Sequence, residues 1–407
     1  MLRFTAVIVA SGLFGQVYAG EIANDLNDYG ISPILNASFL HLENPSLGQT
    51  TGQTENVYII NYGANIDLSK TLPVKDLNVH FEMAYIPNIT NKTFGSTVGD
   101  SIFADPSPYI PNKSELQQFT VKKGFLDHKI VVEAGKSSPS SYFAKPLCNL
   151  LYSCQSPLLP SNPSLFSSWG GTLDYMINSE YDLRVGGWNY IAEFPFQSGW
   201  EMNEQSTGRT YMASLFYQDQ KERNNFGEVG FFRRSAPETN PLTGEQNSGY
   251  SGFYINRKIP ISKSHEINKT FKVPGTTFFE QFTYSFDKGN AKGLLFTNTM
   301  GLTFDSFINS RPMDSYSITL KNYQVTKDKQ NQLVNNYALN GLNYNVDRMQ
   351  TLVQLDANLF VSPQFIISPY IVYSWNTSSK NSYDFSKLPR DGVGFGLMGI
   401  IFLDKLF

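Results

Sequence analysis

The chain has 407 residues, and its 32 Lys and Arg against 35 Asp and Glu give a net charge of -3. Without a basic excess there is no electrostatic basis for a nucleic-acid partner. Charged residues make up 16%, below the roughly 25% of an average soluble domain, while aromatic residues reach 14%. The composition therefore indicates a sheet that faces something other than water.

Residues 1–19 have the pattern of a cleaved secretory signal peptide. Arg3 supplies the positive start, an apolar run follows, and Val17-Tyr18-Ala19 places small residues at the cleavage position. A membrane helix needs about 20 apolar residues, and neither this run nor any later segment reaches that length. We therefore expect residues 20–407 to be exported without a helical anchor.

Alternation with a period of two dominates the mature chain. Apolar residues recur at every second position over residues 58–68, 77–85, 294–304 and 353–361. Segments of about ten residues match a tilted strand that crosses a bilayer, and short turns alternate with longer polar loops. The pattern predicts an all-β fold, a transmembrane antiparallel β-barrel with long extracellular loops partly folded into its lumen.

A soluble β-sandwich is the competing fold, because one buried face also produces alternation. Sandwich strands are usually five or six residues long, shorter than these. Aromatic residues also gather at the strand ends, as in a membrane-interface girdle: Tyr58, Tyr85, Tyr373 and Trp375. About 16 strands would use roughly 170 residues and leave the remainder for turns and long loops.

The two cysteines, Cys148 and Cys154, lie close together within residues 137–168. In an exported chain such a pair favours a disulfide, and it would staple this Ser- and Pro-rich loop. A metal site is the alternative, but no His lies nearby, so we expect neither metal nor cofactor. The stapled loop 137–168 is the candidate for a constriction, and an external protective loop is the other interpretation.

The last strand is predicted over residues 392–407 and ends in an aromatic residue. Phe395, Leu397, Ile401 and Phe407 fall on one face of this strand. A C-terminal Phe in such a strand resembles the signal that the barrel assembly machinery recognises, although Lys405 departs from that pattern. Phe407 is therefore the expected assembly signal.

The segment around the cysteines resembles the carbohydrate-selective porins of Gram-negative outer membranes. Gly135-Lys136 has Lys where the family favours Arg, and Cys148, Cys154, Pro157 to Pro163 and Trp169-Gly170-Gly171 follow in the family's order. Further matches occur at 181–186, at 368–373 and at Leu26 to Ile31, the last overlapping the short periplasmic segment expected over 20–30. The resemblance implies a 16-stranded barrel whose inward loops narrow a channel that passes sugars by diffusion.

Alternation also predicts which charged side chains line the pore. Glu82, Asp174, Asp182 and Arg184 lie opposite the apolar faces of their strands, and Glu133 is assigned inward although Val131 shares its face. Lys136 lies at a strand end and points either into the constriction or into solvent. Carboxylates, amides and guanidinium groups suit the hydroxyls of a sugar, yet any wide lumen must be polar.

Three other functions remain open beside sugar uptake. A porin for hydroxy acids or cyclic polyols would need a cationic eyelet, for which Lys136, Arg184, Arg233 and Arg234 are candidates. A receptor or adhesin barrel would need a plug or an additional domain, and neither is visible. An enzyme is disfavoured, since only four His residues are present and no nucleophile motif accompanies them.

The expected partners are outer-membrane lipid, small sugars or related polar solutes, and the barrel assembly machinery. The sequence leaves a monomer and a homotrimer both open.

Overall fold

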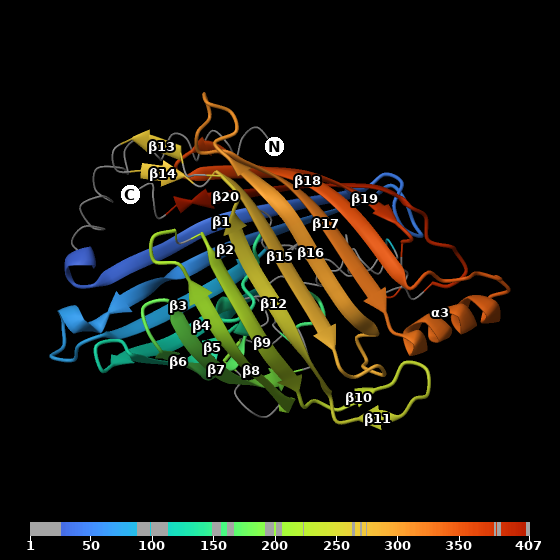
Figure 1. Ribbon diagram of the computed structural model, residues 1–407, viewed down its shortest axis with the longest axis horizontal. Helices are drawn as coiled ribbons and strands as arrows, with labels where there is room; N and C mark the ends of the chain where they lie inside the picture. The colour runs from blue at the N-terminus through green and yellow to red at the C-terminus, as the bar shows by residue number, and fades with distance from the viewer. Residues whose placement is uncertain are drawn as a thin grey trace.

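In the computed structural model, sixteen antiparallel strands form a closed barrel (Figure 1). The structure describes residues 26–87, 98, 113–148, 156–160, 167–191, 199–200, 206–222, 224–262, 265–268, 271–273, 275–377, 380 and 384–403. The first and last strands pair with each other as well as with their sequence neighbours, so the ring has no edge. Closure is what a bilayer demands, because lipid offers no partner for an unpaired backbone group.

The barrel strands range from the eight residues of β5 to the fifteen of β2. In chain order they are β1 (Ile31–Asn44), β2 (Gln53–Asp67), β3 (Leu77–Ile86), β4 (Lys113–Phe125), β5 (Ile130–Ser137), β6 (Ser168–Met176), β7 (Tyr181–Ile191), β8 (Ser206–Gln218), β9 (Phe226–Arg234), β12 (Tyr250–Pro260), β15 (Thr276–Ser285), β16 (Leu294–Asp305), β17 (Ser315–Val325), β18 (Met349–Ser362), β19 (Phe365–Trp375) and β20 (Gly392–Phe402).

The remaining elements lie in the connections between these strands. Two small hairpins are built from β10 (Glu238–Thr239) with β11 (Gln246–Asn247) and from β13 (His265–Asn268) with β14 (Phe271–Val273). The described helical elements include the 3-10 turns η1 (Leu68–Lys70) and η2 (Pro139–Ser141) and the helix α3 (Lys327–Leu339). None of the described helices has the length and hydropathy to span a membrane.

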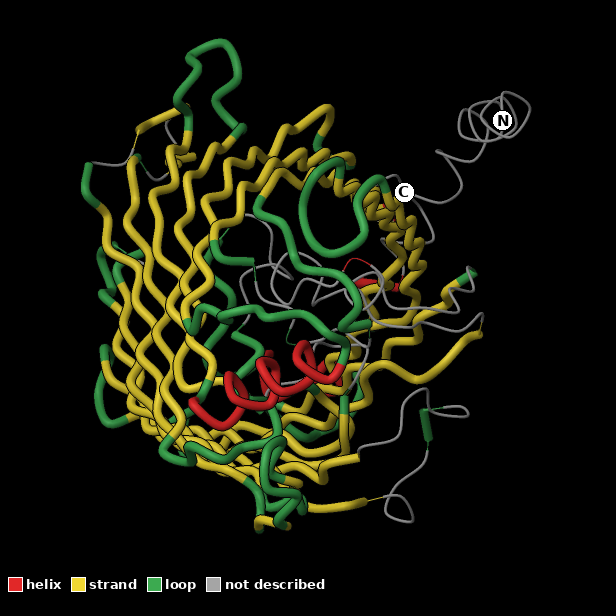
Figure 2. The backbone as a smooth tube through the Cα atoms, turned by 90° about the vertical axis from the view of Figure 1, so that its right-hand side faces the viewer, coloured by secondary structure: helices red, strands yellow, loops and turns green. Residues whose placement is uncertain are grey.

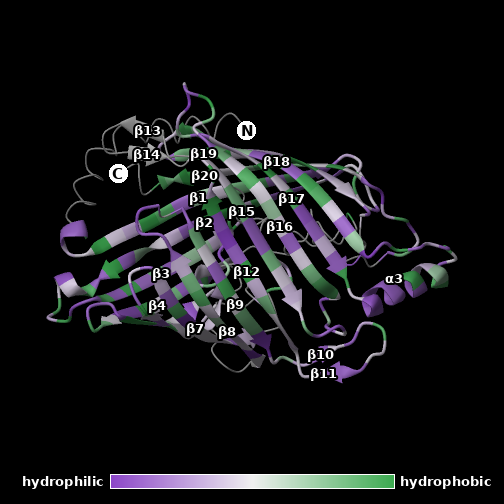
Figure 3. Cartoon of the chain, in the orientation of Figure 1, coloured by the Kyte–Doolittle hydropathy of each residue, from purple (hydrophilic) through white to green (hydrophobic). Residues whose placement is uncertain are grey.

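The two faces of the wall differ in composition, as the alternating colours in Figure 3 show. On β9 the even-numbered residues from Glu228 to Arg234 are buried on the lumen side, while Val229 and Phe231 are exposed on the outer side. An apolar outer face meets lipid, and a polar inner face meets water or the loops inside the barrel.

The two ends of the barrel differ in the length of their connections. One end of the barrel, called here the long-loop end, carries the long connections, among them 138–167, 235–249 and 326–348. The opposite end, the short-turn end, carries tight connections such as 126–129 and 363–364. Helix α3 lies across the mouth at the long-loop end (Figure 2). Gln49 Nε2 holds the helix there by donating to the Tyr337 hydroxyl at 3.0 Å. The same amide also donates to the Asp384 carbonyl, in the connection between β19 and β20, at 2.8 Å.

The closed ring confirms the predicted fold and strand number and excludes the sandwich. The proposed girdle residues Tyr58, Tyr85, Tyr373 and Trp375 are all exposed. The described part of the last strand is β20, which begins at Gly392 and ends at Phe402; Phe407 and the signal segment 1–19 lie outside the described residues.

Candidate functional site in the barrel lumen

The connection between β5 and β6 turns into the lumen immediately after β5. Ser138 caps η2, since its hydroxyl accepts from the Ser140 amide. Trp188 of β7 donates from Nε1 to Ser137 Oγ at 3.0 Å, and its ring meets Phe143 edge-on at 5.9 Å between centroids. These contacts direct the chain inward from the wall.

The residues 138–148, called here the inner loop, are then anchored to the far wall. Glu228 Oε2 on β9 accepts from the Ala144 amide at 3.0 Å, and Gln281 Nε2 on β15 donates to the Ala144 carbonyl at 3.0 Å. Asn256 Nδ2 on β12 donates to the Lys145 carbonyl at 3.0 Å. Three wall side chains thus bind the backbone of two consecutive loop residues, and the inner loop crosses the lumen.

A second part of the same connection follows the wall farther on. Tyr250 of β12 donates its hydroxyl proton to the Leu158 carbonyl at 2.9 Å, and the Ser156 amide donates to Gln281 Oε1 at 3.1 Å. Leu158 and Phe143 are fully buried within one apolar cluster that includes the inward rings of the wall. Loop and wall therefore share a core inside the barrel.

Glycines on the lumen face leave room for these rings. At Gly230 of β9, a Cβ atom would lie 2.4 Å from the ring of Tyr254, which donates to Glu228 Oε1 at 2.6 Å. A larger residue at this position would displace the tyrosine and, with it, the carboxylate that anchors the inner loop.

Four of the predicted pore residues gather on the lumen wall beside the inner loop. Asp174 on β6 lies opposite Arg184 on β7 in the strand register. Arg184 Nη2 lies 3.4 Å from Asp182 Oδ2, and its Nη1 donates to the Tyr142 carbonyl at 3.3 Å. Glu133 on β5 is the fourth member, and we call these residues, Glu133, Asp174, Asp182 and Arg184, the charged wall cluster.

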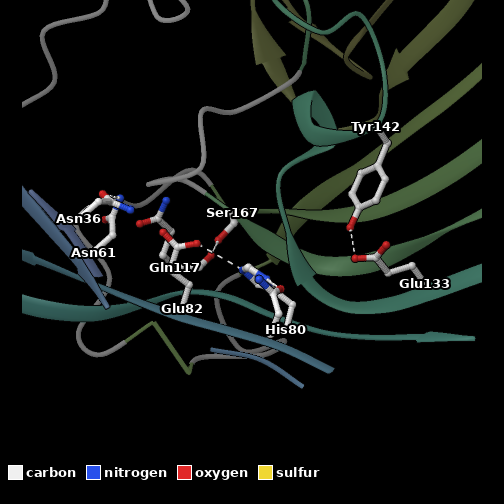
Figure 4. A network of polar contacts seen from close by, with 9 residues as sticks. Asn36, Asn61, His80, Glu82, Gln117, Glu133, Tyr142 and Ser167 are labelled. Atoms are coloured by element: carbon white, nitrogen blue, oxygen red, sulfur yellow. Dashed lines mark hydrogen bonds and ion pairs between the residues drawn. The ribbon is translucent and has the colours of Figure 1, made fainter. Parts of the chain in front are cut away.

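Two aromatic side chains complete the charged wall cluster. The Arg184 guanidinium lies 3.8 Å above the ring centroid of Phe216 on β8. The Tyr142 hydroxyl donates to Glu133 Oε1 at 2.6 Å (Figure 4). Burial and the neighbouring Glu133 carboxylate raise the pKa of the Tyr142 phenol, so it stays protonated and keeps this bond.

The inner loop adds a cation to this region at Lys145. Burial and the positive charge of Arg184 lower the pKa of Lys145, while Glu228 and Asp174 act in the opposite direction. The ammonium therefore loses its proton at a lower pH than a free lysine would.

Glu82 lies apart from the charged wall cluster, on β3. Its Oε2 is 3.3 Å from His80 Nε2 (Figure 4). On the other side of the ring, His80 Nδ1 is 2.5 Å from Asn65 Oδ1 on β2. His80 shares the lumen face with Glu82, and the alternation of β3 already places both residues there.

Lys136 differs from the pore-lining position that the sequence suggested. It lies opposite Phe119 in the register, on the face that alternates away from Glu133, and its side chain is almost fully buried. Its Nζ donates to the carbonyls of Leu116 at 2.7 Å and Gly199 at 2.6 Å. The reason is the odd separation between Glu133 and Lys136, which places them on opposite faces of β5.

Cys148 is disulfide-bonded. Cys154 lies outside the described residues, so its pairing with Cys148 stays a prediction. The described groups of His, Cys, Asp and Glu include none that could hold a metal ion.

Sequence reasoning missed the residues that hold the inner loop. Glu228, Gln281 and Asn256 lie on strands whose alternation assigns them to the lumen, but alternation carries no information about which wall residues a loop will reach. Polar wall residues also bind one another, as where Lys321 Nζ donates to Gln354 Oε1 at 2.8 Å.

Comparison with known proteins supports this architecture. The family model described as carbohydrate-selective porin, OprB family, matches residues 56–386. The high-pH structure of Pseudomonas putida OprB is 16% identical, with 94% of this chain and 96% of that chain covered and a TM-score of 0.77. The low-pH structure of the same protein is 14% identical, with 94% and 95% covered and a TM-score of 0.57.

At these identities the two structures show a shared fold. No curated protein sequence matches this chain. The family resemblance inferred from the sequence is confirmed, because the family model spans far more than half of the chain. The chain belongs to the carbohydrate-selective porin family, OprB.

Proposed function

We propose that this porin lets small sugars diffuse across the outer membrane through a lumen narrowed by the inner loop. The observation that carries the proposal is the charged wall cluster, whose carboxylates and guanidinium lie beside the inner loop and next to the ring of Phe216. The protein performs no covalent chemistry in this proposal, and the concentration gradient of the sugar drives the flux.

Sugar hydroxyls both donate and accept hydrogen bonds, so they suit a wall that offers both. Asp174 and Asp182 accept, Arg184 donates, and the ring of Phe216 provides an apolar face. These groups replace part of the hydration shell of the sugar as it passes. Binding must stay weak, because a tightly held sugar would block the channel.

The positions of the four candidate cations argue against a route for anions and support a neutral substrate. Lys136 is buried between two carbonyls, and Arg233 lies on the outer face of β9. Arg234 Nη2 is 2.7 Å from Glu238 Oε1, in a buried ion pair. Arg184 is the candidate that lies on the lumen wall beside the inner loop, and its neighbours Asp174 and Asp182 are carboxylates.

The proposal extends to export and assembly. Residues 1–19 direct export and are then cleaved, residues 20–30 stay in the periplasm, and Phe407 is read by the barrel assembly machinery. The barrel encloses a complete lumen by itself, which supports a monomer as the minimal transport unit, and a homotrimer would leave the pathway unchanged.

The test is single-channel conductance of the purified protein in a planar bilayer, titrated with glucose and then with lactate. We expect concentration-dependent block by glucose and a reversal potential without strong anion selectivity. Block by lactate alone, with anion-selective reversal potentials, would assign the channel to hydroxy acids instead. Folded, heat-modifiable protein that forms no channel would contradict both and favour a receptor.

A further inference from the structure

A hollow of about 380 Å³ lies on the wall of the barrel near the long-loop end of β6, β7 and β8. Trp169, Asn189, Arg209 and Tyr211 line it with side chains that alternate with the lumen-facing residues of these strands. The same outer face continues below with Leu183, Val185 and Leu215, all of them exposed. Gly170 and Trp188 of the lumen-facing set complete the lining, but the other lining residues lie on the outer face, so among the described residues the hollow lies on the membrane side of the wall.

Glycine creates the floor of this hollow. Gly171 and Gly187 lie opposite each other in the register, and Gly187 lies opposite Tyr211. A Cβ atom at Gly187 would make only an ordinary contact with the Tyr211 ring, at 3.4 Å. Among the described residues no side chain fills this space, and a Cβ atom can be added at Gly187 without a clash.

Two arginines lie at the rim of the hollow. Arg209 is opposite Asn189, and Arg233 of β9 is opposite Tyr211, so the two arginines are diagonal neighbours on one face. Such diagonal neighbours are about 7–8 Å apart, close enough for one anion to meet both. Within the described residues neither guanidinium makes an ion pair.

The apolar wall begins directly beneath these arginines. Leu215 follows Arg209 and Tyr211 along β8, and Phe231 and Val229 precede Arg233 along β9, all exposed on the outer face. In an outer-membrane porin the long loops face outward, so this cationic rim lies at the level of the outer-leaflet headgroups. A positive rim above an apolar wall matches an amphiphile with an anionic head.

We propose that this outer-wall site, formed by Trp169, Gly187, Asn189, Arg209, Tyr211 and Arg233, binds the phosphorylated sugar headgroup of an anionic glycolipid. The guanidinium groups bind its phosphate, since arginine pairs with phosphate in a bidentate geometry. Trp169 and Tyr211 pack against the sugar ring, Asn189 meets its hydroxyls, and the acyl chains run along Leu215, Val229 and Phe231.

The test measures binding of bisphosphorylated lipid A to the purified, detergent-solubilised barrel by native mass spectrometry. In the double variant Arg209→Gln, Arg233→Gln we expect the affinity to fall at least tenfold. Gly187→Leu fills the hollow without removing charge and should weaken binding as well. Lys129→Gln is the matched control, because it removes one outward cation at the short-turn end, where Lys129 lies over the Tyr175 ring.

Two further probes separate the possible sources of the phosphate. Dephosphorylated lipid A should bind the wild-type barrel weakly, with an affinity like that of lipid A for the double variant. Inorganic phosphate at millimolar concentration should not compete with lipid A for the site. Equal binding by all variants, equal binding of dephosphorylated lipid A, or competition by inorganic phosphate would each overturn the proposal. Glucose block should be unchanged in every variant, so failure of this site is distinguishable from failure of the sugar pathway.

Discussion

Replacing Glu228 with Gln should release the inner loop from the far wall. The Glu228 carboxylate accepts from the Ala144 amide at 3.0 Å and from the Tyr254 hydroxyl at 2.6 Å, and the residue is 3% exposed. An amide offers one acceptor oxygen in place of two and turns its NH₂ toward one of the donors. One charge-assisted hydrogen bond is therefore lost, which costs about 2 kcal/mol.

A loss of about 2 kcal/mol raises the population of the released loop roughly 30-fold, since 1.4 kcal/mol is a factor of ten. Single-channel recording should then show larger open-channel noise and weaker glucose block in Glu228→Gln. Glu245→Gln, a charge loss at an exposed residue of the 235–249 link, is the control and should leave both unchanged. Folded Glu228→Gln protein with wild-type noise and block would refute the role of Glu228 as the loop anchor.

Three further predictions concern the same lumen. Reduction of the predicted Cys148–Cys154 disulfide should raise open-channel noise or conductance, and unchanged single-channel traces would remove this loop from the constriction. Arg184→Gln should weaken glucose block and shift the reversal potential toward cations, because Asp174 and Asp182 lose their counter-charge; a variant with unaltered block would place sugar binding elsewhere. Burial and the charge of Arg184 lower the pKa of Lys145, so its ammonium loses its positive charge at a pH below the usual lysine range. The cation selectivity of the channel should therefore begin to increase at that pH. A Lys145→Met variant that keeps the same pH dependence would contradict this.

The barrel fold could be predicted from the sequence because the pattern that indicates it lies within each strand. Alternation with a period of two is imposed by lipid on one face and water on the other, so each strand carries its own evidence. Asp174, Asp182 and Arg184 were assigned to the lumen by this rule, and the structure places them together on adjacent strands. Closure into a ring then follows, because an open edge is not tolerated in lipid.

The same rule was insufficient at Lys136 and at the inner loop. An odd separation from Glu133 turns Lys136 to the opposite face, where the Leu116 and Gly199 carbonyls bury its ammonium. Gly199 is distant in sequence, so no local pattern could indicate that contact.

The sequence by itself determined the membrane barrel, its family and the polarity of its lumen, since these depend on periodicity and composition. Only the tertiary structure decided where the inner loop crosses the lumen and which wall residues hold it. Glu228, Asn256 and Gln281 belong to three different strands, and only ring closure brings them to face Ala144 and Lys145. Contacts of this kind depend on the curvature and register of the whole barrel, which no single segment encodes.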